Sequence, residues 1–452
     1  MTDHRSPQHI MIVGAGFGGF FAARELARKL SPDVARITMI SDVDGLLYQP
    51  LLPEVAVGTL DPRTIVVPLS TALKSVHLVR GRVTGVDLDD RAVAVQTHAG
   101  PERRISYDRL LVAAGSVSRL LDIPGLAEHG LGFKTIGQAL YLRDLVLWRM
   151  ERANDEPDAA DRRALLNFAV VGAGYAGTEL VAQMARMTSR LADRFPGIGA
   201  DEVRWTLLDM AAKVMPELGG DLGDRAIRVL RRRGVDVRLR TSVDRLTAVG
   251  AHLTDGSFLA GAAVVWCAGV TPNPIVSATG LPTVAGRLAV GTDLRVNGRA
   301  GIYAVGDAAA VPDVTKPRSP DGTRPLCPPT AQHAMRQGRA VAHAIVADVT
   351  GGRAKPYRHR DLGLVVDLGG RQAVARPLGI PLNGAFAKAI TRSYHLAALP
   401  TGRRRLQALA DWVLAGGTPD DVSFGLPMTA SVLASAEHRD TKPVRTDPVG
   451  ET

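Results

Sequence analysis

The apolar positions of the chain recur in two similar blocks, each of which predicts a buried strand followed by a helix. Residues 10–13 are a short apolar run that leads into a glycine-rich turn and then into apolar positions at helical spacing through residue 30. The same order returns at residues 168–171. Strands that are buried on both faces read as short apolar runs, so this pattern predicts two doubly wound α/β units.

Further apolar runs supply the remaining strands that such units need. Residues 77–97 alternate around turns and predict antiparallel strands, and several other runs end in small or acidic residues. These runs cover residues 35–41, 107–116, 204–210, 263–274 and 302–305.

Each of the two turns has the spacing G-x-G-x-x-G. The first contains Gly14, Gly16 and Gly19, and the second contains Gly172, Gly174 and Gly177. The first two glycines of such a turn allow a tight bend and a close approach to a pyrophosphate, and the third allows close packing of the helix on the strand. One match could be a tight turn without a ligand, but two matches favour two bound dinucleotides.

Polar residues at the strand ends indicate which dinucleotides are bound. Asp209 ends the second strand of the second unit, where a carboxylate favours the free ribose of NADH over the phosphorylated ribose of NADPH. The corresponding acid of the first unit is Asp42, which stands one place late. Gly306 and Asp307 follow a later strand, and we interpret them as the return of the chain to an FAD domain. Small residues at other strand ends, expected near the cofactors, are Ala114, Gly115 and Gly269.

Composition limits the chemistry that the chain can perform. The 452 residues include 55 Lys and Arg against 45 Asp and Glu, a net charge of +10 that favours an anionic partner such as a nucleotide or a membrane surface. The only cysteines, Cys267 and Cys327, provide no disulfide framework, and no Cys or His cluster has metal-ligand spacing. No run of 18 apolar residues is present, so we expect no membrane-spanning helix and no proton pumping.

The order of these motifs resembles that of the type II NADH dehydrogenases, which are single-chain NADH:quinone oxidoreductases. The resemblance covers about residues 10–427 and rests on GAGFGG, YQPLLPEVAVG, YDRLLVAAG, GAGYAGTEL, WCAGV, YAVGD and PPTAQHA. It implies an FAD domain with an inserted NADH domain, FAD as cofactor, NADH as co-substrate, and menaquinone or ubiquinone as acceptor. The domain limits that we expect are 1–125 and 291–355 for FAD, 126–290 for NADH, 356–427 for an amphipathic C-terminal region, and 428–452 for a disordered tail.

The resemblance also implies roles for particular residues. Gln49 lies in a segment that borders the flavin, and Glu179 would face the nicotinamide and the flavin. The alternative for Glu179 is a carboxylate placed favourably at a helix N-terminus. Ala331 and Gln332 match the A-Q-x-A-x-Q segment near the quinone, whereas Gln337 comes one place late. We therefore expect the quinone contact from Gln332, and we take Glu179, Gln332 and Gln49 as the catalytic candidates.

The C-terminal region has the pattern of a membrane-surface anchor. No acid occurs between Asp367 and Asp411. The interval contains the basic residues Arg371, Arg376, Lys388, Arg392, Arg403, Arg404 and Arg405. Two apolar stripes at helical spacing consist of Leu382, Phe386, Ile390 and Tyr394, and of Leu406, Leu409, Ala410 and Val413, with Trp412 near the edge of the second.

Basic amphipathic helices predict peripheral attachment, here to the cytoplasmic face of a bacterial plasma membrane. The alternative is that the stripes pack on the protein itself or form a homodimer. We expect no nucleic-acid partner.

Three other functions remain open at this point. A sulfide:quinone oxidoreductase shares the fold but needs sulfur-carrying cysteines at the flavin, for which only Cys327 is placed. A soluble ferredoxin or rubredoxin reductase would use a protein acceptor and bind no lipid. A sensor that binds FAD and NADH would show little turnover.

Overall fold

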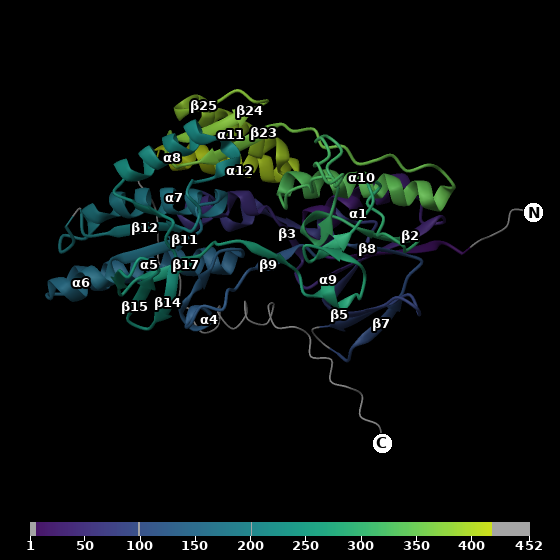
Figure 1. Ribbon diagram of the computed structural model, residues 1–452, viewed down its shortest axis with the longest axis horizontal. Helices are drawn as coiled ribbons and strands as arrows, with labels where there is room; N and C mark the ends of the chain where they lie inside the picture. Colours follow the sequence, from purple (N-terminus) through teal and green to yellow (C-terminus); the bar gives the residue numbers. More distant parts are fainter. Residues whose placement is uncertain (1–5, 98–99, 200, 418–452) are drawn as a thin grey trace, which may run out of the picture.

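The protein consists of two parallel α/β sheets side by side, with a smaller C-terminal sheet and two helices along one side of both (Figure 1). The computed structural model describes residues 6–97, 100–199 and 201–417. The predicted pair of Rossmann-like units is confirmed. The predicted disordered tail, residues 428–452, lies outside the described residues.

The first sheet has the strand order β21-β8-β1-β2-β5-β6-β7. Its strands are β1 (Gln8–Val13), β2 (Ala35–Ser41), β5 (His77–Asp87), β6 (Ala92–Thr97), β7 (Arg103–Ser106), β8 (Arg109–Val112) and β21 (Ile302–Ala304). Strands β21, β8, β1, β2 and β5 run parallel, and the predicted antiparallel strands β5, β6 and β7 complete the edge. Because β21 pairs with β8, the residues between them form an insertion into this unit.

The second sheet lies within that insertion and is parallel throughout, with the order β10-β17-β11-β12-β13. Its strands are β10 (Leu131–Gly132), β11 (Asn167–Val171), β12 (Arg204–Asp209), β13 (Asp236–Leu239) and β17 (Ala263–Trp266). Helices α5 (Ile136–Asp155), α7 (Tyr175–Leu191) and α8 (Gly220–Arg232) belong to the same unit. The exact domain limits stay a prediction.

Two helices of the first unit pack closely against each other. They are α1 (Phe17–Lys29), which follows the first glycine-rich turn, and α10 (Ala331–Thr350). A Cβ on Gly338 of α10 would lie 2.3 Å from the Gly18 carbonyl oxygen of α1, so this crossing requires glycine. The segment around Gln332 is thereby fixed to the helix that begins at the first glycine-rich turn.

Shorter elements complete the two units. The strands are β3 (Gly45–Leu47), β4 (Val66–Pro68), β9 (Ser116–Ser118), β14 (Val243–Thr247), β15 (Gly250–Leu253), β16 (Phe258–Ala260), β18 (Val270–Pro272), β19 (Thr283–Val284), β20 (Arg287–Ala289) and β22 (Ala309–Ala310). The helices are α2 (Leu52–Ala56), α3 (Leu69–Ala72), α4 (Leu126–His129), α6 (Ala159–Leu165), α9 (Ile275–Ala278), and the 3₁₀ turns η1 (Gln49–Leu51), η2 (Pro62–Ile65), η3 (Ala192–Arg194), η4 (Pro216–Leu218) and η5 (Gly306–Ala308).

The C-terminal region differs in part from the prediction of two helices. It contains the antiparallel sheet β23 (Gly363–Asp367), β24 (Ala373–Pro377) and β25 (Leu382–Asn383), then α11 (Gly384–Ala398) and α12 (Gly402–Gly417). Leu382 was expected on the first helical stripe, but it pairs with Ala375 in β25. The prediction was wrong there because the helix begins only at Gly384. Leu382 lies four residues before Phe386, which is helical spacing, but it still belongs to the strand.

Candidate functional site

Two glycines of the first glycine-rich turn are required by neighbouring backbone, and the third has open space around it. Gly14 has φ +98°, and a Cβ there would lie 2.5 Å from the Ala113 carbonyl oxygen. A Cβ on Gly19 would lie 1.9 Å from the carbonyl oxygen of Gly14. Gly16, in contrast, has open space within 4 Å and an ordinary φ of −64°. The open position at the N-terminus of α1 fits the approach of a pyrophosphate.

The second turn has the same construction. Gly172 has φ +109° and packs on the Cys267 backbone, and a Cβ on Gly177 would lie 2.0 Å from the Gly172 carbonyl oxygen. Gly174 again has nothing within 4 Å, at the N-terminus of α7. The chain therefore contains two cradles of equal shape that fit two dinucleotides.

The acids at the ends of the second strands are not equivalent. Gly14 N–H donates to the Ile40 carbonyl at 2.9 Å, and Gly172 N–H donates to that of Leu208 at 2.7 Å. Ser41 therefore takes the place that Asp209 holds in the second unit, and the exposed Asp42 follows one residue later, as the sequence indicated.

Asp209 is tied directly to the second glycine-rich turn. Its carboxylate accepts the Ala173 N–H at 2.5 Å and the Ala211 N–H at 2.7 Å. This geometry places its charge beside the turn, where the ribose of a dinucleotide would lie.

The small residues at other strand ends form open turns. Gly115 and Gly269 have φ of +69° and +82°, and nothing lies within 4 Å of a Cβ built on either. Asp307 lies beyond β21, where its carboxylate accepts the Ser116 hydroxyl at 2.6 Å.

Gln337 supports the Gly306 turn from inside the protein. It is buried, and its Oε1 accepts the Gly306 N–H at 2.7 Å. A side chain in this position fixes the turn before Asp307, which gives a physical reason for the glutamine that stood one place late.

Gln49 lies at the contact between the two units. It is exposed in η1 and donates to the Lys134 carbonyl at 3.0 Å, and Lys134 Nζ donates to the Ser116 carbonyl at 2.9 Å. Its neighbour Tyr48 is buried, and the Tyr48 hydroxyl lies 3.0 Å from His395 Nδ1. Residues 48 and 49 thus connect the first unit to the second unit and to α11.

Glu179 belongs to a buried group of charged side chains that comes from several distant segments. Its Oε1 accepts the Asp367 N–H at 2.7 Å. The Asp367 carboxylate pairs with Lys388, and Lys388 Nζ lies 3.8 Å from Glu54 Oε1. Glu54 also accepts the indole N–H of Trp412. We call Glu54, Glu179, Asp367 and Lys388 the carboxyl cluster.

The carboxyl cluster has three acids but one base, and its protonation follows from that imbalance. Burial raises the pKa of Glu179 well above its usual value, and burial together with Asp367 raises the pKa of Glu54 to about 8. Burial opposes the ionisation of Asp367 as well, but Lys388 lowers the pKa of that carboxyl. The ion pair of the cluster is therefore Asp367 with Lys388, while Glu54 and Glu179 bind protons more readily than ordinary glutamates.

Most of the carboxyl cluster was missed by sequence reasoning. Lys388 was expected among surface cations, but it is buried against Asp367. Trp412 was expected at the edge of an apolar stripe, but it is buried against Glu54. The available signal was Glu54, a lone acid inside the apolar segment LLYQPLLPEVAVG.

Gln332 lies at the start of α10 next to β23. It donates to the Gly363 carbonyl at 3.1 Å, and its Oε1 accepts from Arg336 at 3.3 Å. Tyr394 of α11 lies beside the same pair, and burial raises its pKa while Arg336 and Gln332 act to lower it. Gln332 and Ala331 are both half-buried.

Sulfur transfer, metal binding and membrane spanning find little support in the described residues. Cys327 is buried, and burial, followed by the charge of Asp313, raises the pKa of its thiol to about 12, so it is a poor sulfur carrier. Among the described residues, no group of His, Cys, Asp and Glu is placed to hold a metal ion. No helix in that part of the chain is long and apolar enough to cross a bilayer.

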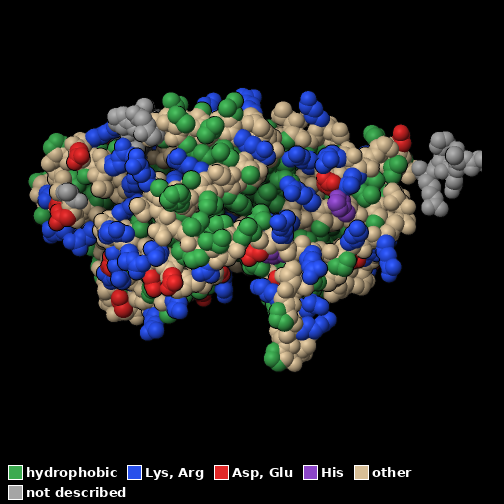
Figure 2. Space-filling model, turned by 90° about the horizontal axis from the view of Figure 1, so that it is seen from above, with side chains coloured by type: hydrophobic (Ala, Val, Ile, Leu, Met, Phe, Trp, Pro, Cys, Tyr) green, Lys and Arg blue, Asp and Glu red, His purple; other side chains and the backbone are tan. Residues whose placement is uncertain are grey.

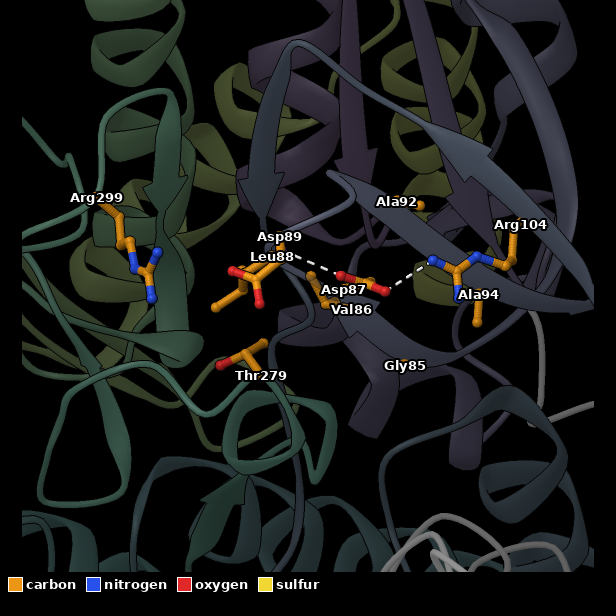
Figure 3. Close-up of a pocket in the computed structure, with 10 residues that line it drawn as sticks. All are labelled: Gly85, Val86, Asp87, Leu88, Asp89, Ala92, Ala94, Arg104, Thr279 and Arg299. Atoms are coloured by element: carbon orange, nitrogen blue, oxygen red, sulfur yellow. Dashed lines mark hydrogen bonds and ion pairs between the residues drawn. The ribbon is translucent and has the colours of Figure 1, made fainter. Parts of the chain in front are cut away.

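A cavity of about 500 Å³ lies beside the hairpin of β5 and β6 (Figure 3). Its wall includes Asp87, Arg104, Thr279 and Arg299, and the first two form an ion pair at 2.7 Å. None of the predicted site residues lines it, so this cavity is separate from the dinucleotide cradles.

Comparison with known proteins decides the family. Residues 8–338 match the model of the pyridine nucleotide-disulphide oxidoreductases. A type II NADH:quinone oxidoreductase of Mycobacterium tuberculosis is 33% identical over 423 residues, which cover 90% of this chain and 87% of that protein. The chain belongs to the type II NADH:quinone oxidoreductases. The expected family, its enzyme class and its use of FAD and NADH are confirmed.

Solved structures agree with this fold. The NDH2 of Plasmodium falciparum in complex with NADH superimposes with a TM-score of 0.83 at 17% identity, over 91% of this chain and 99% of that one. A ferredoxin reductase of Rhodopseudomonas palustris superimposes with a TM-score of 0.61 at 24% identity, over 82% of this chain and 88% of that one. These two structures show the fold alone. The identity to the curated type II NADH:quinone oxidoreductases is what leaves the sulfide:quinone oxidoreductase, the soluble reductase and the sensor not favoured.

Proposed function

We propose that this protein oxidises NADH through FAD and delivers two electrons to a membrane quinone, menaquinone or ubiquinone. The observation that carries the proposal is the pair of glycine-rich cradles with open middle positions, Gly16 and Gly174, on the two sheets of one chain. When bound, FAD supplies the chemistry that accepts a hydride and releases electrons. The protein's part is to hold both dinucleotides and the acceptor in place.

The first cradle is proposed to hold FAD. Gly14, Gly16 and Gly19 would admit its pyrophosphate. Asp42 would lie toward the ribose and Asp307 toward the ribityl chain. Ala114, Gly115 and Gly306 would leave room for the cofactor at the strand ends.

The second cradle is proposed to hold NADH. Gly172, Gly174 and Gly177 would admit the pyrophosphate, Asp209 would accept the ribose hydroxyls, and Gly269 would leave room at the end of β17. In the space between the two cradles, Glu179 and Gln49 would border the nicotinamide and the flavin. Gln332 with Ala331 would border the quinone.

The raised pKa of Glu179, which burial causes, suits this position because it favours a neutral carboxyl. A protonated, buried carboxyl can donate a hydrogen bond, and it adds no charge that would oppose hydride transfer nearby. The reduction of a quinone by NADH also consumes one proton, and a group that holds a proton at Glu179 or Glu54 is a source for it. These residues would act by position and proton supply.

The C-terminal helices are proposed to attach the protein to the cytoplasmic face of a bacterial membrane. Phe386 of α11 is 82% exposed, and Leu406 and Val413 of α12 are 69% and 67% exposed. Figure 2 views the side that is uppermost in Figure 1, where hydrophobic side chains gather among Lys and Arg. Exposed apolar groups ringed by cations suit an anionic bilayer. The alternative occupant of this face is a second copy of the chain.

Steady-state oxidation of NADH tests the proposal. The rate should rise on addition of a soluble quinone and should be unaffected by an added ferredoxin. NADH oxidation that needs ferredoxin and ignores quinone would instead identify a soluble reductase.

A further inference from the structure

Arg336 brings a positive charge to the position next to Gln332. It lies one helical turn along α10, where the A-Q-x-A-x-Q segment of the family has its second glutamine. Its Nη1 is 3.3 Å from Gln332 Oε1. A cation thus replaces a neutral amide beside the side chain that is proposed to contact the quinone.

Aromatic rings hold the guanidinium in this place. Arg336 Nη1 lies 3.2 Å from His359 Nδ1 and 3.3 Å from His359 Nε2, so it sits over the ring and not at a single lone pair. The His359 ring stacks on His333, with centroids 3.7 Å apart. The Tyr357 hydroxyl contacts both rings, at 3.1 Å from His333 Nδ1 and 3.3 Å from His359 Nδ1. Arg336 therefore has a defined orientation.

The negative charges that act on the rings beside Arg336 come from Asp361 and Asp313, neither of which pairs with the guanidinium. Burial, followed by the neighbouring cation, lowers the pKa of His359, and burial lowers the pKa of His333 to about 4, so both rings are neutral at pH 7. Among the described residues, no carboxylate forms an ion pair with Arg336. The nearby Asp361 accepts the Gly363 N–H at 2.8 Å. A half-buried guanidinium without a counter-ion favours an anionic ligand.

We propose that Arg336 determines acceptor specificity by binding the ionised hydroxyl of a 2-hydroxy-1,4-quinone, while Gln332 binds a carbonyl of the same ring. A planar guanidinium matches two adjacent oxygens, here the ionised hydroxyl and the carbonyl beside it. Gln332 uses one amide hydrogen for the Gly363 carbonyl, and the Tyr394 hydroxyl is the other hydrogen-bond neighbour of its side chain, which a quinone carbonyl would displace. NADH and one proton reduce the bound quinone to the quinol with release of NAD⁺. The third hydroxyl of the product is then an ordinary phenol, so it takes a second proton from solvent at neutral pH. The inference rests on the proposed function.

Two naphthoquinones of nearly equal size test the inference. 2-Hydroxy-1,4-naphthoquinone is an anion at neutral pH, and 2-methyl-1,4-naphthoquinone is neutral. Their dissociation constants from the oxidised, FAD-loaded protein are measured by titration calorimetry for the wild type, Arg336→Gln and Arg336→Lys. Arg353→Gln, which removes an exposed arginine beyond α10, controls for the change in net charge.

The ratio of the two dissociation constants is the deciding quantity. A hydrogen-bonded charge contributes about 1.5–3 kcal/mol, so Arg336→Gln should weaken the hydroxyquinone about 10- to 100-fold relative to the methylquinone. Arg336→Lys should retain part of the preference, and Arg353→Gln should retain all of it. An unchanged ratio in Arg336→Gln, or an equal loss for both quinones, overturns the role of Arg336. A wild type that reduces neither quinone overturns the proposed function instead.

Discussion

Gly16 and Gly174 mark the nucleotide cradles at the level of single residues. The first and third glycines of each turn are required by neighbouring backbone, but these two have open space around them. Because no described atom lies within 4 Å of a Cβ at either position, the close approach of a ligand is the reason that we propose for glycine there.

Asp209 leads to a prediction about nucleotide choice. Asp209→Ala should raise the KM for NADH about 10- to 100-fold, because a charged hydrogen bond is worth about 1.5–3 kcal/mol. The same substitution should reduce the preference of the enzyme for NADH over NADPH. Asp209→Asn is the matched control, since its amide oxygen can still accept the Ala173 N–H. Wild-type protein that uses NADPH as well as NADH would rule out this role.

Gln332 and Gln337 are predicted to affect different half-reactions. Gln332→Leu should slow reoxidation of the reduced flavin by quinone more than it slows reduction by NADH. Gln337→Leu should disturb the Gly306 turn and weaken FAD retention. Stopped-flow traces of each half-reaction, together with the FAD content of each variant, distinguish the effect of Gln332→Leu from that of Gln337→Leu. Equal slowing of both half-reactions by Gln332→Leu would place that residue outside the quinone site.

Glu54 should make stability depend on pH in a definite direction. Its folded pKa of about 8 lies above the ordinary 4.5, so the folded state binds the extra proton. The contribution of this proton to the free energy of unfolding is complete below pH 4.5. It falls by up to ~1.4 kcal/mol per pH unit as the pH rises from 4.5 to about 8. Glu54→Gln removes this loss, so its Tm relative to the wild type should rise from pH 6 to pH 8.

An exposed glutamate provides the control for that measurement. Glu128→Gln, on the surface of α4, should leave the Tm difference constant across the same pH range. A Tm difference for Glu54→Gln that does not change with pH would show that Glu54 is ionised in the folded protein.

Among the elements, α12 has two distinct faces. Trp412 and Ala408 are buried against the protein, and Asp411 accepts the Thr64 hydroxyl at 2.7 Å. Leu406 and Val413 point away from it. The sequence predicted this helix and its exposed stripe, because both depend on local spacing. It could not predict which apolar residue turns inward, since that depends on Glu54, more than 350 residues away in sequence.

The exposed face of α12 is predicted to bind anionic liposomes. Changing Arg403, Arg404 and Arg405 together to Glu should abolish sedimentation with liposomes at low salt, and salt should weaken binding of the wild type. Arg405 also donates to the Leu399 carbonyl at 2.9 Å. A second variant therefore keeps the arginines and changes Leu406 and Val413 to Ser.

The control variant changes three exposed arginines to Glu at the opposite edge of the molecule, around β5 to β7. These are Arg91, Arg103 and Arg299. This variant should still bind liposomes. If the wild type does not sediment at low salt but elutes as a dimer, the face is a subunit interface.

Across the whole molecule, segments far apart in sequence meet where α2, α7 and the C-terminal region contact one another. Glu54 comes from the first unit, Glu179 from the second, and Asp367 and Lys388 from the C-terminal region. The cradles were predictable because each needs only six consecutive residues. The carboxyl cluster was not, because no local pattern records which distant acids will share one lysine.

The order of electron transfer is the central claim, and rapid mixing without oxygen tests it most directly. Purified protein with its FAD is mixed first with NADH and then with a soluble quinone, while the visible flavin band is recorded. We expect one equivalent of NADH to bleach the band, and quinone to restore it at a rate proportional to quinone concentration. Bleaching by NADH that quinone does not reverse, but a ferredoxin does, would contradict the account.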